Sequence, residues 1–72
     1  MEIHQQIALG SGEIANLIDT HQDLMEDNDA ICEVVNLGRQ SLEFFITSGD
    51  EERALYEVLN TRAKLMEFLG LA

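Results

Sequence analysis

The sequence predicts an all-α fold, a small helical bundle that is built on an antiparallel helix hairpin and completed by dimerisation. Apolar residues recur at spacings of three and four along the chain, as they do on one face of an α-helix. The 72 residues include no proline, so no ring clash forbids a long helix. A chain of this length forms one domain at most, residues 1–72, and its own core is thin.

The first helix is predicted from an apolar stripe in the first third of the chain. The stripe consists of Ile14, Leu17, Ile18, His21, Leu24 and Met25. The same spacing extends backwards to Ile7 and Ile3, which would carry the helix through Gly10-Ser11-Gly12. Each glycine weakens a helix by about 1 kcal/mol relative to alanine. A continuous helix from Ile3 and a break at the glycines therefore both fit the sequence.

The second helix is predicted to begin after Asp27-Asn28-Asp29, whose side chains suit a helix cap or a turn. Its apolar stripe consists of Ile31, Val34, Val35, Gly38, Leu42 and Phe45, and Leu37, Phe44 and Ile46 widen it. A helix that is apolar over so much of its circumference contacts two partners. We therefore expect this helix to be the central one.

A boundary signal and a short connection place the third helix next to the second. The boundary has two interpretations. Ser48 and Glu51 have the spacing of a capping box; alternatively, Gly49 ends the second helix and Asp50 caps the third. Both interpretations put the boundary at 47–50, and the short connection makes residues 30–47 and 50–70 antiparallel neighbours. The third stripe consists of Leu55, Val58, Leu59, Arg62, Leu65, Met66 and Leu69.

The surplus of apolar surface predicts a homodimer. A core this small supplies about 3–5 kcal/mol, and the second helix is more apolar than one partner helix can cover. The expected oligomer interface consists of Val34, Leu37, Phe44, Phe45 and Arg62. Arg62 interrupts an apolar stripe, so it either extends to solvent or pairs with a carboxylate of the first segment or of a second subunit.

Charge is distributed unevenly along the chain. The 14 acidic and four basic residues give a net charge of -10, and residues 1–36 contain eight acids and no base. This sign excludes direct binding of nucleic acid and argues against anionic membranes. The acidic residues are densest at Asp19, Asp23, Glu26, Asp27, Asp29 and Glu33. They form either a solvated helix face or a surface that binds a basic partner.

Chemistry-bearing residues are few. Counted from Asp27, positions six and twelve of a calcium loop would be Cys32 and Gly38, so the EF-hand pattern fails. His4 and His21 are too far apart for a helical metal pair, and the acids beside Cys32 disfavour a thiolate. We expect no enzyme, no metal and no cofactor. His21 is expected to be packed and hydrogen-bonded, with a pH switch as the alternative.

Composition also bears on location. No apolar run approaches the roughly 18 residues of a membrane helix, and Met1 to Leu9 has no basic start typical of a secretory signal. With a lone cysteine, these features predict a cytoplasmic protein.

Two functions are consistent with these features. The first is a small acidic protein-interaction module, a regulator or helical chaperone-like adaptor, that acts through an apolar helix face. The alternative is an acidic mimic of nucleic acid that occupies the basic site of a nucleic-acid-binding protein. Salt distinguishes the two, because only the second depends mainly on charge.

The junction between the last two predicted helices, Leu42 to Tyr56 with the sequence SGDEE at its centre, resembles small helical connector proteins of enteric bacteria that act in biofilm regulation. The resemblance covers about fifteen residues. It implies a helical regulator, and no site residue is carried over from it.

Overall fold

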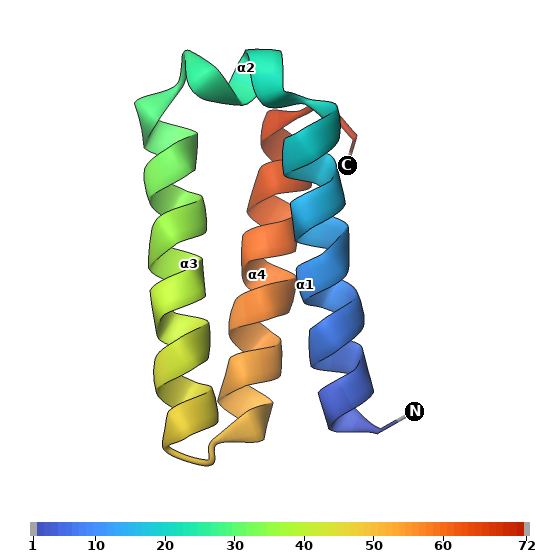
Figure 1. Cartoon of the computed structure of the whole chain (residues 1–72), viewed down its shortest axis with the longest axis vertical. Helices are drawn as coiled ribbons and strands as arrows, with labels where there is room; N and C mark the ends of the chain where they lie inside the picture. The colour runs from blue at the N-terminus through green and yellow to red at the C-terminus, as the bar shows by residue number, and fades with distance from the viewer. Residues whose placement is uncertain (1, 72) are drawn as a thin grey trace.

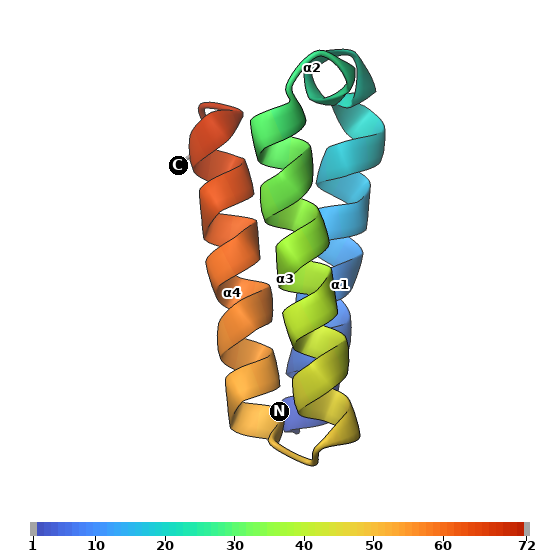
Figure 2. The same ribbon diagram turned by 90° about the vertical axis from the view of Figure 1, so that its left-hand side faces the viewer.

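The computed structural model describes residues 2–71 and consists of helices joined by short turns. The helices are α1 (Ile3–Thr20), α2 (Gln22–Glu26), α3 (Asp29–Thr47) and α4 (Glu51–Phe68). The three long helices lie side by side along the longest axis, and α2 crosses one end of them (Figures 1 and 2). Every element of the described residues is helical, so the predicted all-α class is confirmed. Among these residues, no helix has the length and apolar character needed to cross a membrane.

The turn between α3 and α4 follows the second of the two interpretations. Gly49 ends α3 in the left-handed conformation, with φ 83°, and the N–H of Asp50 donates to the carbonyl of Phe45 at 2.8 Å. The Asp50 side chain then accepts from the N–H of Arg53 at 3.2 Å and caps α4. The Ser48 hydroxyl instead donates back to the carbonyl of Phe44 at 2.9 Å. Ser48 therefore closes α3 and does not cap α4.

The start of α3 also follows the sequence. The Asn28 side chain accepts from the N–H of Ile31 at 3.2 Å, which satisfies one of the free amides of the first turn. At the preceding junction, His21 is the C-cap of α1, and its Nδ1 lies 2.9 Å from the carbonyl oxygen of Leu17. These two contacts fix the short α2 between the long helices.

Helix α1 is continuous through Gly10-Ser11-Gly12. Gly10 is buried, and a Cβ built on it would overlap the Cγ1 methyl of Val58 in α4. Tertiary packing thus stabilises a stretch whose intrinsic helix propensity is low.

The central helix is α4, so the expectation that α3 is central was wrong. Helix α4 packs against both α1 and α3, whereas no Cα of α1 lies within 8 Å of a Cα of α3 in the described part of the chain. In Figure 1, α4 is seen between the other two. The cause lies in small residues: Gly10 of α1 and Gly38 of α3 both face α4, so its backbone approaches both helices closely. The broad apolar surface of α3 is left partly exposed.

The core has two parts. Met25, Ile31, Val35 and Leu65 form one cluster, and Ile7, Ala54 and Val58 form the other. Ile14 packs against both clusters. Two members of the predicted apolar stripes, Leu24 and Leu59, are exposed and lie outside the core, with 56% and 45% of their surfaces accessible. In the short α2, Met25 takes the inward position and its neighbour Leu24 therefore points outward.

Candidate functional site

The six clustered acids lie around α2, at one end of the bundle. Asp19 is near the end of α1, Asp23 and Glu26 are on α2, Asp27 is its C-cap, and Asp29 and Glu33 are in the first turns of α3. All six are exposed. We call these six residues the acidic patch.

The acidic patch is a diffuse surface. Within residues 2–71, none of its carboxylates forms an ion pair with a basic side chain. The same residues contain no group of three or more ligands arranged to hold a metal ion. The structure therefore brings the predicted acids to one end of the molecule without making them converge on a point.

Four of the five expected interface residues lie together on α3. Leu37 and Phe44 are seven residues apart, which places them on the same side of the helix, and they are 55% and 66% exposed. Val34 and Phe45 are half-buried beside them. The rings of Phe44 and Phe45 meet edge to face at 5.4 Å between centroids. We call these four residues the α3 apolar face.

The fifth, Arg62, lies elsewhere. Its Nε is 2.6 Å from Oε2 of Glu13, so it forms an ion pair between α4 and α1 within the chain. The Nε is buried, and its N–H is not aligned for a hydrogen bond with that oxygen. The sequence left Arg62 either extending to solvent or pairing with a carboxylate of the first segment or of a second subunit. The structure shows a carboxylate of the first segment beside it.

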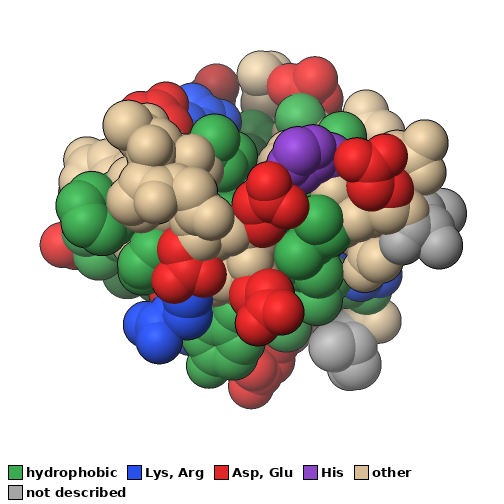
Figure 3. Space-filling view, turned by 90° about the horizontal axis from the view of Figure 1, so that it is seen from below, with side chains coloured by type: hydrophobic (Ala, Val, Ile, Leu, Met, Phe, Trp, Pro, Cys, Tyr) green, Lys and Arg blue, Asp and Glu red, His purple; other side chains and the backbone are tan. Residues whose placement is uncertain are grey.

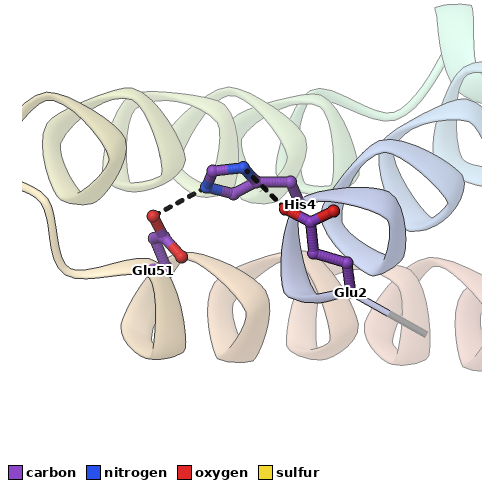
Figure 4. A network of polar contacts seen from close by, with 3 residues as sticks. All are labelled: Glu2, His4 and Glu51. Atoms are coloured by element: carbon purple, nitrogen blue, oxygen red, sulfur yellow. Dashed lines mark ion pairs between the residues drawn. The ribbon is translucent and has the colours of Figure 1, made fainter.

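At the opposite end of the bundle, His4 connects two carboxylates (Figure 4). Its Nε2 lies 2.7 Å from Oε1 of Glu51, and its Nδ1 lies 3.6 Å from Oε1 of Glu2. The contact joins the start of α1 to the start of α4, a link that the sequence does not reveal. Figure 3 shows acidic and hydrophobic side chains interspersed on this end. Because these side chains are largely exposed, the pair adds at most about 1 kcal/mol.

Sequence reasoning missed a groove between α1 and α3. Its middle is a hollow of 130 Å³ lined by Ser11, Ile14, Ala15, Val35, Gly38, Arg39, Leu42, Val58 and Thr61. A second hollow, of 300 Å³, shares Val35 and Arg39 with it and extends to Gln22, Met25 and Glu26. We call the two together the α1–α3 groove. The signal for this groove in the sequence is the pair of short side chains, Ser11 and Ala15, on one side of α1.

Cys32 lines the second hollow near α2. It is half-buried, and its Sγ donates to the carbonyl of Met25 at 3.2 Å. The thiol therefore helps to hold α2 against α3.

In comparisons with protein-family models, curated proteins and solved structures, the chain gave no significant match.

Proposed function

We propose that this chain is a small, acidic, non-enzymatic protein-interaction module, a regulator or chaperone-like adaptor, that acts through the α3 apolar face. The observation that carries the proposal is the exposure of Leu37 and Phe44 on one side of α3. Apolar surface removed from water contributes about 25 cal/mol per Å². Covering these two side chains with another protein surface is therefore favourable.

A second copy of the chain is the proposed first occupant of this face. The guanidinium carbon of Arg53 lies 5.2 Å from the centroid of the Phe45 ring, so one edge of the α3 apolar face is positively charged. A cation at this edge is able to pair with a carboxylate of the second chain, even though each chain has a net charge of -10. Residual apolar surface on the other helices stays available for a different protein.

The variant Phe44→Glu should shift the protein from dimer to monomer. A buried carboxylate without a partner is costly, whereas Glu is well tolerated on an exposed helix surface of the monomer. We expect the dimer dissociation constant to rise at least about 30-fold, which corresponds to about 2 kcal/mol. Sedimentation velocity at tens of micromolar protein measures the change.

The matched control is Leu24→Glu, which places the same charge on a comparably exposed leucine of α2. It should leave the dissociation constant within about twofold. If the unmodified protein sediments only as an 8.1 kDa species, the homodimer is ruled out.

The alternative function, an acidic mimic of nucleic acid, is supported by the acidic patch. All six of its carboxylates are exposed and lack basic partners among the described residues. Like charges placed this close repel each other unless a basic surface faces them. Such a surface would compete with a phosphate backbone for the same lysine and arginine side chains.

Salt separates the alternative from the first proposal. If this chain is a mimic, it should bind lysate proteins that a DNA column retains, and this direct binding should weaken about tenfold or more between low and physiological salt. The triple variant Asp23→Asn, Glu26→Gln, Asp27→Asn should lose the effect. Binding that is insensitive to salt and to this variant would instead favour apolar docking.

A further inference from the structure

The α1–α3 groove is the open side of the bundle. Helix α4 contacts both neighbours, but α1 and α3 do not approach each other to within 8 Å between Cα atoms. Val58 and Thr61 of α4 form the floor, and both are buried from solvent in the bundle. The arrangement leaves room for a fourth long element against α1 and α3.

The dimensions of the groove suit a helix. Its α3 wall runs from Cys32 to Leu42, about 15 Å at 1.5 Å per residue, which is close to three turns. The α1 wall includes Ser11 and Ala15, and Gly38 lies on the opposite wall. Such short side chains let a further helix pack at the usual interaxial distance of about 8–10 Å.

The charges of the groove are polarised. Arg39 lines both hollows, and no carboxylate of residues 2–71 lies within 4.0 Å of its guanidinium. At the α2 end the sign reverses, because Glu26 lines the groove and Asp19 and Asp23 line the adjoining surface around Gln22. An occupant that matches these charges has a carboxylate at its middle and basic residues at one end.

We propose that the α1–α3 groove binds an amphipathic helix of a partner protein, about three turns long. Its apolar face lies over Val58 and Thr61, a Glu or Asp faces Arg39, and Lys or Arg residues lie against the acidic α2 end. The inference rests on the proposed function only in that the chain acts by binding protein, and it uses a surface other than the α3 apolar face. A second copy suits the groove less well, because its own acidic charge would meet the acidic α2 end.

A synthetic peptide tests the charge pairing. The probe is an amphipathic peptide of about 15 residues, long enough to form a helix on binding, with leucines on one face, a central glutamate and two lysines at one end. Titrated into isotope-labelled protein, it should shift the amide signals of Ser11, Ala15 and Arg39. A double-mutant cycle combines Arg39→Gln in the protein with Glu→Gln in the peptide. We expect a coupling of at least about threefold in the dissociation constant, and none when Lys64→Gln replaces Arg39→Gln.

A steric variant tests the location. Ala15→Leu should fill the α1 wall and weaken peptide binding at least about tenfold, whereas Ala63→Leu, the same change at an exposed site of α4 outside the groove, should not. Ala15 is exposed, so the variant should keep the circular dichroism and thermal unfolding of the parent.

Three outcomes would overturn the inference: unshifted groove amides at millimolar peptide, the absence of coupling at Arg39, or equal effects of the two alanine substitutions. A fourth result separates it from the proposed function. If Ala15→Leu dissociates the dimer while Phe44→Glu does not, the groove is the self-association surface. The partner-helix inference is then wrong, and so is the choice of the α3 apolar face.

Discussion

Leu65→Ala is expected to cost about 2–5 kcal/mol of folding free energy, enough to unfold much of the protein. The Leu65 side chain is 0% exposed and belongs to the cluster with Met25, Ile31 and Val35. Removing its branched end leaves a cavity where α3, α4 and α2 meet, and the surrounding helices relax only in part. Urea unfolding followed by circular dichroism measures the loss, at a fixed protein concentration because the proposed dimerisation would make stability depend on concentration.

Leu59→Ala is the matched control for Leu65→Ala. It is the same change on the same helix, but Leu59 is 45% exposed. We expect a loss of about 1 kcal/mol or less, because less transfer free energy is lost and water fills the space. Equal losses for the two variants would show that the described core does not hold the bundle together.

Gly38→Ala is expected to destabilise the protein by a net 1–2 kcal/mol, roughly, although alanine is the better helix former. A Cβ built on Gly38 would overlap Oγ1 of Thr61 and lie 3.1 Å from its Cβ. Rotation of the Thr61 side chain moves Oγ1 but not the Thr61 Cβ, so the contact between the two Cβ atoms remains. Helices α3 and α4 must therefore move apart slightly. The same change at Gly10 should also destabilise the protein, because the Cγ1 methyl that it would overlap belongs to Val58, a buried β-branched residue with one strongly preferred rotamer in a helix.

The control for Gly38→Ala has the opposite sign. A Cβ built on Gly12 meets nothing within 4 Å, although Gly12 is also inside a helix. Gly12→Ala should therefore stabilise the protein by about 0.5–1 kcal/mol, through helix propensity alone. Thermal unfolding of the two variants gives the comparison, and adding Thr61→Ala should recover part of the loss at Gly38. Stabilisation by both substitutions would contradict the close approach of α3 and α4.

The acidic patch and the α3 apolar face were largely predictable, because each is formed by residues near one another in the sequence. Leu37 and Phe44 share a side of one helix whatever packs against it. Arg62 was not predictable in the same way. From its position in the apolar stripe, the Arg62 side chain could either extend to solvent or pair with a carboxylate. Its pairing with Glu13 depends on how α1 lies along α4.

The sequence by itself determined the all-α class, the cap region before α3 and the boundary at 47–50, because hydrophobic period and capping act over a few residues. It left open which residue caps α4 and whether α1 continues through its glycines, and it did not predict the break at His21 that separates α2 from α1. It did not determine which helix is central. The central position of α4 depends on Gly10 and Gly38, which are distant in the chain and both pack closely against α4. How closely two helices approach depends on the size of the side chains that face each other, and these pairs are known only once the helices are packed. Because α4 lies between α1 and α3, the α1–α3 groove stays open.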